Sequence, residues 1–191
     1  FLRLLALRNY PIKSLRLLAS ARSAGKKLKF NGEDVVVEEL KPDSFKGIDH
    51  AFFSAGGGIS KEFAPHAAQA GAIIIDNTSA FRYDAEVLLV IPEINPQDAF
   101  EYGERRIIAN PNCTTIVSLL PTFPLHKQFG LKRAIMSSYQ AISGAGAQAM
   151  EELQQQMRDW AAGKPLTVKH QPKQIAFNVI PRIDAVQDNG Y

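Results

Sequence analysis

Residues 50–76 read HAFFSAGGGISKEFAPHAAQAGAIIID, and this segment carries the clearest signal of the chain's architecture. An apolar run from His50 to Ala55 leads into three glycines, residues Ile59–Ala70 follow a helical pattern that Gly71 ends, and Ile73–Asp76 is apolar again. The order of strand, helix and strand is typical of a βαβ unit. Because both runs are continuously apolar, they predict parallel strands buried beneath helices in a doubly wound α/β fold.

The sequence on either side extends this alternation of strands and helices. Residues 28–37, LKFNGEDVVV, predict a hairpin, because Asn-Gly is a preferred pair for a two-residue turn. Near Asn110 the sequence changes character, and we place a boundary there between two domains, residues 1–110 and 111–191. The other predicted elements are strands at 15–19, 87–91, 107–109 and 131–142, and helices at 1–10, 114–128 and 147–162.

The composition is that of a chain with its own hydrophobic core, because 46% of the residues are hydrophobic and 21% are charged. No apolar run is long enough for a membrane-spanning helix, so we expect no membrane partner. The single cysteine, Cys113, excludes an internal disulfide framework and any zinc site that needs several cysteines, and we expect no metal. A lone thiol fits a reducing compartment, so we expect the protein in the cytoplasm.

Basic residues are concentrated at the N-terminal end. Residues 1–29 contain Arg or Lys at eight positions and no acidic residue, whereas acidic residues predominate in the rest of the chain. Only Phe1 and Tyr10 could stack on bases there, which argues against nucleic acid as a partner. The basic stretch fits a small molecule that carries phosphate, and it equally fits a solvated basic edge.

Three predicted strands run into loops of small, polar or glycine residues, at 20–25, 54–58 and 76–80. In open α/β sheets, ligands bind at the carboxyl ends of the strands. We therefore expect these loops to share one edge and to form a nucleotide site. Each loop alone would also serve as a plain turn.

Cys113 lies where a predicted strand ends, a turn intervenes and a helix begins. The positive end of a helix dipole favours the thiolate, which is the nucleophilic form. A lone buried cysteine is the alternative, but the loop position favours a nucleophile. His126 follows 13 residues later, roughly 20 Å along one helix, and no histidine in the chain has the context of an acid/base partner.

The residues around Cys113, Asn110-Pro111-Asn112-Cys113-Thr114-Thr115, resemble the active-site motif of aspartate-semialdehyde dehydrogenases. The resemblance implies a Rossmann-like NADP-binding domain at 1–110 and part of an α+β catalytic and dimerisation domain at 111–191. It also implies a cytoplasmic homodimer or homotetramer. Further segments resemble the family's motifs in the same order: LASARSAGK at 18–26, FSAGG at 53–57, DNTSAFR at 76–82 with VIPEIN at 90–95, and SYQAISGAG at 138–146.

This resemblance implies a reaction through a covalent intermediate on Cys113. The thiol would attack aspartate semialdehyde, hydride transfer to NADP would leave a thioester, and phosphate would release aspartyl phosphate; the physiological direction is the reverse. Gln140 would position the substrate, and Arg82 and Asn112 would hold its phosphate group. The implied cofactor-binding residues are Ser20, Arg22, Ser23, Ser54, Gly56, Ser143 and Gly144.

The resemblance also implies parts that these 191 residues do not contain. The family's Gly-rich pyrophosphate loop is expected before Phe1 and its general-base histidine after Tyr191, so we expect this chain alone to lack turnover. One rival is another acyl-phosphate reductase, such as N-acetyl-gamma-glutamyl-phosphate reductase, which typically carries Gly in place of Asn112. The other rival is a non-catalytic homologue.

Overall fold

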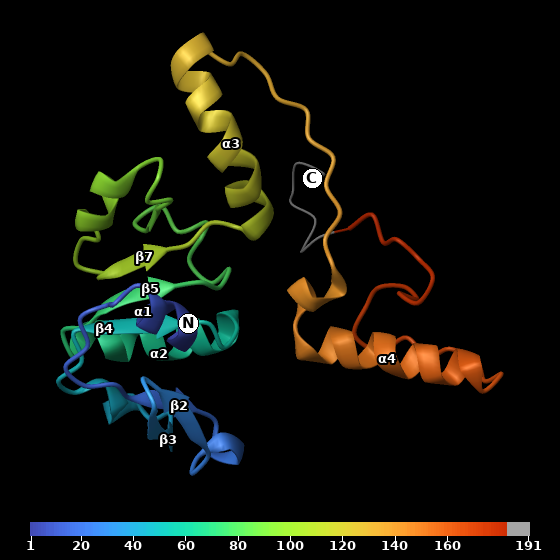
Figure 1. Ribbon diagram of the computed structural model, residues 1–191, viewed down its shortest axis with the longest axis horizontal. Coiled ribbons are helices and arrows are strands. Elements are labelled where there is room, and N and C mark those ends of the chain that lie inside the picture. The colour runs from blue at the N-terminus through green and yellow to red at the C-terminus, as the bar shows by residue number, and fades with distance from the viewer. Residues whose placement is uncertain (183–191) are drawn as a thin grey trace. The chain divides into compact units, whose positions relative to one another are not determined.

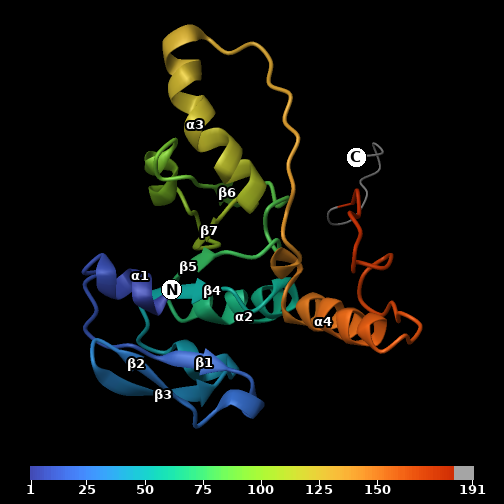
Figure 2. The same ribbon diagram turned by 45° about the vertical axis from the view of Figure 1, so that its right-hand side comes forward.

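The predicted parallel sheet is present in the computed structural model, which describes residues 1–182. Its described strands are all parallel and follow the order β4-β5-β7-β6 (Figures 1 and 2). The chain forms two units, residues 1–134 and the residues from 135 onward, and the sheet belongs to the first. The strands are β4 (His50–Phe53), β5 (Ile73–Asp76), β6 (Leu88–Leu89) and β7 (Ile107–Ala109).

One face of this sheet is buried beneath α2 (Gly57–Gln69) (Figure 1). Ala64 and Ala67 are fully buried, and their small side chains let the helix backbone approach Phe53 and Ile74 closely. Successive strand residues point to opposite faces, so the other face holds the half-buried residues of each strand. The interior of the first unit therefore lies between α2 and the sheet.

The second face of the sheet is covered in part by the N-terminal segment. α1 (Leu2–Leu7) is flanked by Phe1 and Tyr10, and both rings pack against Phe52 on β4, with ring centroids 5.7 and 6.1 Å away. The sequence predicts a sheet covered on both faces, whereas the second face stays half-buried among the described residues.

A second sheet contains the predicted hairpin. β2 (Lys27–Phe30) and β3 (Glu33–Glu39) are antiparallel, and Asn31 and Gly32 between them have φ of 49° and 88°, as a type I′ turn requires. β1 (Leu17–Ala19) pairs with β3 in the order β1-β3-β2. No described strand joins this sheet to the parallel one.

The remaining predicted elements of the first unit form with shifted ends. α2 begins at Gly57, two residues before the predicted start, and the strand predicted at 87–91 shortens to Leu88–Leu89. α3 (Cys113–Phe129) continues through Pro121 and Pro124, and its C-cap is Gly130, which has φ of 67°. Three short 3₁₀ helices complete the unit: η1 (Ala21–Ser23), η2 (Pro42–Phe45) and η3 (Pro96–Phe100).

The strand predicted at 131–142 is wrong. Residues 131–141 are exposed and have no regular structure, and the 3₁₀ helix η4 (Ile142–Ala145) follows them. A strand needs a neighbour for its N–H and C=O groups, and no described segment pairs with this one. The predicted domain boundary at Asn110 precedes α3, whereas the two units divide after it. That boundary stays a prediction, and the end of its second domain, 183–191, lies outside the described residues.

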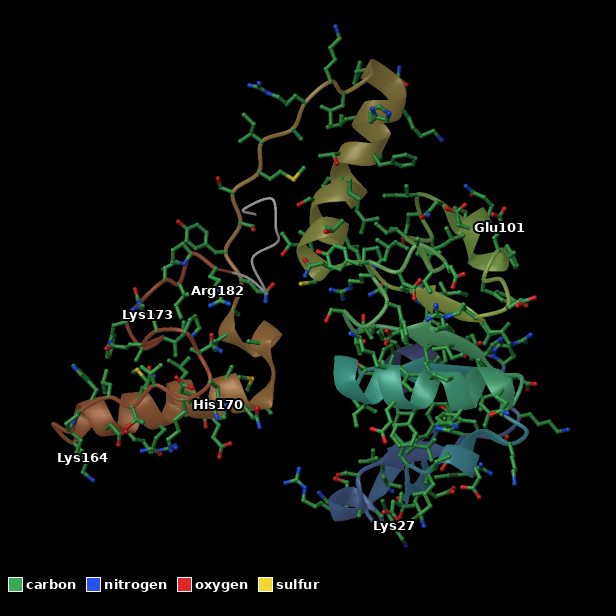
Figure 3. All side chains as sticks on the ribbon, turned by 180° about the vertical axis from the view of Figure 1, so that it is seen from behind. Lys27, Glu101, Lys164, His170, Lys173 and Arg182 are labelled. Carbon is green, nitrogen blue, oxygen red and sulfur yellow. The ribbon has the colours of Figure 1, made fainter. Side chains whose placement is uncertain are left out.

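The second unit is organised by α4 (Ala147–Ala161) and the loop that returns along it, on which Figure 3 labels His170. Two buried polar residues of α4 bind this loop. The Glu152 carboxylate accepts hydrogen bonds from the backbone N–H groups of His170 and Gln171. The Gln156 side chain donates to the carbonyl of Thr167 and accepts from two backbone N–H groups of residues 175 and 176.

Replacing Glu152 by Gln is expected to weaken this loop in a pH-dependent way. Burial of the Glu152 carboxyl raises its pKa, but backbone hydrogen bonds from His170, Lys169 and Gln171 outweigh burial and hold the pKa below its ordinary value of 4.5. A lowered pKa stabilises the fold above the ordinary pKa, and this contribution is lost as the pH falls through the folded-state pKa. At neutral pH, amide hydrogen exchange should show a loss of roughly 2 kcal/mol in the free energy of local opening.

The matched control is Glu151→Gln, because Glu151 is the exposed neighbour on the same helix. In this control the free energy of local opening of the loop should equal that of the wild type at every pH. For Glu152→Gln, the difference from the wild type in the free energy of local opening should become smaller as the pH falls. A difference that is independent of pH would contradict a role for the ionised carboxylate.

Candidate active site at the carboxyl edge of the parallel sheet

Three neighbouring strands end in register and bring their next residues side by side. Phe53 pairs with Asp76, and Asp76 pairs with Ala109. The ladder continues one step further, because the N–H of Asn77 donates to the carbonyl of Phe53 at 2.9 Å and the N–H of Asn110 donates to the carbonyl of Asp76 at 2.8 Å. The loops after β4, β5 and β7 therefore start from one edge, as predicted for the loops at 54–58 and 76–80.

Polar side chains form a row across this edge. The Asn110 Nδ2 donates to Asn77 Oδ1 at 2.6 Å, and Asn77 Nδ2 lies 3.5 Å from Ser54 Oγ. Ser54 is a predicted cofactor-binding residue, whereas the sequence assigned no role to either asparagine. In the sequence, each asparagine is recognisable only as a small polar residue directly after a buried strand. The pairing register of the strands is needed to show that the side chains meet.

Arg82 lies against the same row. Its Nε donates to the carbonyl oxygen of Asn110 at 3.0 Å, and its Nη2 lies 3.4 Å from the carbonyl oxygen of Asn77. The side chain is half-buried, so these two carbonyls fix the plane of the guanidinium group. A guanidinium has five N–H donors. Three of them remain for an anion after these two bonds.

Cys113 is the first residue of α3 and is exposed, as predicted from its sequence context. Asn112 is the N-cap of that helix, and its side chain accepts a hydrogen bond from the N–H of Thr114 at 2.8 Å. This cap uses the side-chain oxygen of Asn112 and leaves its NH₂ group as a donor. Cys113 follows three residues after Asn110, whose carbonyl accepts the hydrogen bond from Arg82, so the loop that carries the thiol is bound to the loop that carries the guanidinium group.

The glycine turn before α2 borders the Arg82 loop. Gly56 is the N-cap of α2 with φ of 102°, a conformation that favours glycine. A side chain at Gly57 would come within 3.7 Å of Ser79 Oγ and 3.8 Å of the N atom of Ala80. The turn therefore brings backbone N–H groups at the start of a helix to the sheet edge, which is an arrangement that suits a phosphate group.

The first of the three predicted loops is not part of this edge. Ser20, Arg22 and Ser23 follow β1, which belongs to the separate three-stranded sheet, and they lie in and just before the turn η1. The expectation of three loops on one sheet edge is therefore wrong for the loop at 20–25. This loop lies elsewhere because no described strand connects β1 to β4 within one sheet.

The other predicted site residues, Gln140, Ser143 and Gly144, belong to the second unit. All three are exposed, and Ser143 and Gly144 form part of η4. Gln140 folds over Gly144, because a Cβ built on Gly144 would come within 2.8 Å of Gln140 Cδ. Two of the predicted site residues are thus in direct contact.

Replacing Gly144 by Ala is expected to displace the Gln140 side chain. The backbone at Gly144 does not have the positive φ that favours glycine, so the new methyl group acts by its volume alone. If Gln140 positions the substrate, kcat/KM should fall roughly 10- to 100-fold, since small misplacements in an active site are costly. Steady-state kinetics on the protein expressed from its complete gene would measure this.

A double-mutant comparison isolates the cause. Gly144→Ala placed in a Gln140→Ala background should produce no further loss in kcat/KM for the aldehyde at saturating NADP, because the side chain that it displaces is gone. An effect of the methyl group on the proposed nicotinamide contact would appear in KM for NADP instead. Additive losses in the double variant would show that Gly144 acts independently of Gln140.

Two histidines of the first unit have defined positions. His126 lies in the last turn of α3, which is one continuous helix from Cys113. His50 Nδ1 and Tyr10 Oη form a hydrogen bond of 2.7 Å.

Among residues 1–182 there is no cluster of metal-ligating side chains and no helix long and apolar enough to cross a membrane.

Two family models match the chain and together define its class. Residues 1–102 match the NAD-binding domain of semialdehyde dehydrogenase, and residues 123–191 match the dimerisation domain of semialdehyde dehydrogenase. The chain belongs to the semialdehyde dehydrogenase family. This confirms the predicted family and its Rossmann-like α/β class.

Individual relatives agree with this assignment. An aspartate-semialdehyde dehydrogenase of Aquifex aeolicus is 49% identical over 193 residues, which are 100% of this chain and 57% of the relative. The crystal structure of aspartate semialdehyde dehydrogenase II from Vibrio cholerae, complexed with ASA, matches this chain with a TM-score of 0.91 and 44% identity. The match covers 100% of this chain and 56% of the Vibrio chain. A Candida albicans aspartate semialdehyde dehydrogenase with NADP has a TM-score of 0.55 and 28% identity, covering 68% of this chain and 44% of that one. The chain thus spans little more than half the length of the first two.

Proposed function

We propose that this chain carries the nucleophile of an NADP-dependent aspartate-semialdehyde dehydrogenase. The reaction is the reductive dephosphorylation of L-4-aspartyl phosphate to L-aspartate 4-semialdehyde, a step of lysine, threonine, methionine and diaminopimelate biosynthesis. One observation carries the proposal: Cys113 begins α3 on the loop whose Asn110 carbonyl binds Arg82 at 3.0 Å. The names of the Aquifex and Vibrio relatives support the choice of substrate.

Cys113 acts as the nucleophile in both directions. In the biosynthetic direction its thiolate sulfur attacks the acyl carbon of aspartyl phosphate, the C–O bond to phosphate breaks, and inorganic phosphate leaves with the bonding electron pair. The product on Cys113 is a thioester. When bound, NADPH would supply the hydride for reduction of this thioester. Cys113 would then be the leaving group: its C–S bond breaks with the electron pair going to sulfur, which regenerates the thiolate and releases the aldehyde.

Arg82 and Asn112 bind the phosphate group. Arg82 is suited to this role because two carbonyls orient its guanidinium plane and leave further donors for the phosphate oxygens. Asn112 contributes its NH₂ group, since its side-chain oxygen caps α3. Gln140 holds the substrate, and its contact with Gly144 supports a defined position for its amide.

The cofactor lies along the glycine turn before α2. Ser54 and Gly56 lie at that turn, and the backbone N–H groups at the start of α2 suit an anionic group of the cofactor. The remaining proposed contacts are those of Ser20, Arg22 and Ser23 with the 2′-phosphate of NADP, and of Ser143 and Gly144 with the nicotinamide. We propose a homodimer or homotetramer in the cytoplasm, consistent with the match to a dimerisation domain.

The test is a substrate panel on the protein expressed from its complete gene. L-aspartate 4-semialdehyde and N-acetyl-L-glutamate 5-semialdehyde are each supplied with inorganic phosphate and either NADP or NAD. We expect phosphate-dependent NADPH formation with the aspartyl compound. Preference for the N-acetylglutamyl compound would favour the rival reductase, and no reduction with either would favour a non-catalytic homologue.

A further inference from the structure

A carboxylate without a cationic partner is buried at the end of β5. Asp76 is 0% exposed, and Ser60 on α2 and Thr78 on the following loop are 0% and 8% exposed. Among the described residues, Asp76 takes part in no ion pair. Burying a charge is costly unless hydrogen bonds compensate for the lost water, so this arrangement needs a reason.

Hydroxyl and N–H groups satisfy both oxygens of Asp76. Its Oδ1 accepts from Ser60 Oγ at 2.9 Å and from the N–H of Thr78 at 3.1 Å, and its Oδ2 accepts from Thr78 Oγ1 at 2.9 Å. Thr78 Oγ1 in turn accepts from the N–H of Ala80 at 3.1 Å. A fully satisfied buried network of this kind holds its members in one arrangement.

The network joins two loops that have different proposed ligands. Ser60 lies in the first turn of α2, directly after the glycine turn proposed for the cofactor, and its N–H binds the carbonyl of Gly56 at 3.1 Å. Thr78 and Ala80 lie between Asn77 and Arg82, the two residues that contact each other at the sheet edge. The glycine turn before α2 and the loop after β5 are thus both bound to the carboxylate of Asp76, which is buried beneath the residues proposed to contact ligands.

We infer that Asp76, Ser60 and Thr78 form a positioning cluster that holds Arg82 and Asn77 in place for phosphate and ties that loop to the cofactor turn. This inference rests on the proposed function for the identity of the anion. The three residues touch no ligand themselves; they act through Arg82 and the backbone of 77–80. A packing role alone would not need a charged group, because apolar residues of similar volume stabilise an interior at lower cost.

The test is Thr78→Val in the protein expressed from its complete gene. Valine keeps the shape of threonine but removes the Oγ1 that binds Asp76 and Ala80. The readout is protection of Cys113 from alkylation by iodoacetate, followed on the peptide that contains Cys113, as inorganic phosphate is added. We expect the half-protecting phosphate concentration to rise about tenfold, with Thr78→Ser restoring most of the wild-type value.

Thr122→Val is the matched control. It removes a hydroxyl that donates to the carbonyl of Ser118 on α3, and its half-protecting concentration should equal that of the wild type. A lower melting temperature for Thr78→Val with unchanged phosphate protection would overturn the inference and leave a structural role. Protection needs no turnover, so an inactive wild type that phosphate still protects would refute only the proposed reaction. A wild type that phosphate does not protect would refute the inference.

Discussion

Replacing Cys113 by Ser is expected to lower kcat for phosphate-dependent reduction of NADP by roughly 1000-fold or more. Cys113 begins α3 at the carboxyl edge of the sheet and is exposed, so a substrate can reach its sulfur. A serine hydroxyl at this point keeps the volume of the side chain but is a far weaker nucleophile at neutral pH. Steady-state kinetics with L-aspartate 4-semialdehyde would measure the loss.

Binding and stability serve as controls for this variant. Because the side chain is exposed and Asn112 still caps the helix, the melting temperature and the affinity for NADPH should stay close to those of the wild type. Retained turnover in Cys113→Ser would remove Cys113 from the proposed reaction. Lost cofactor binding would show instead that the substitution disturbs the fold.

Replacing Arg82 by Lys is expected to lower kcat/KM for phosphate by roughly 100-fold, which corresponds to the loss of about 3 kcal/mol of charged hydrogen bonding. The guanidinium group binds the carbonyls of Asn110 and Asn77 and still has donors for an anion. A lysine ammonium is a point charge and has no planar fork with which to bind two carbonyls and a phosphate together. Phosphate titrations at saturating aldehyde would measure the change.

Arg105→Lys provides the matched control. Arg105 pairs with Asp84 at 2.8 Å and with Glu86 at 3.1 Å and has no part in the proposed phosphate site. Surface ion pairs contribute little, so this variant should keep the wild-type KM for phosphate. Equal effects at both positions would indicate a general loss of positive charge rather than a phosphate site at Arg82.

The parallel sheet could be predicted because its signal is local. The strands at 50–53, 73–76 and 107–109 are short apolar runs, and Gly71 follows closely after the end of the helix between the first two. The hairpin was equally local, since Asn31-Gly32 specifies its own turn. The strand expected at 131–142 would need a neighbouring strand, and the residues of one segment do not reveal whether such a neighbour is present.

The candidate site was predictable in part for the same reason. The local context of Cys113, a turn between a strand and a helix, was enough to single it out, whereas Arg82 was chosen only through the family resemblance. The row from Ser54 to Asn110 depends on the pairing register of three strands, which no local pattern encodes. The cluster around Asp76 was missed because Ser60 and Thr78 are separated from each other by a helix and a strand and meet only in the folded chain.

The backbone around Asn77 and Asn110, at the carboxyl edge of the parallel sheet, disfavours their deamidation. Deamidation begins when the backbone nitrogen of the next residue attacks the asparagine side chain, which requires an available N–H at that residue. Asn110 precedes Pro111, which has no N–H, and Asn77 precedes Thr78, whose N–H is bound to the buried carboxylate of Asp76 at 3.1 Å. The contacts that align this edge therefore also slow the conversion of its two amides to carboxylates, which would place negative charge beside Arg82 and repel an incoming phosphate.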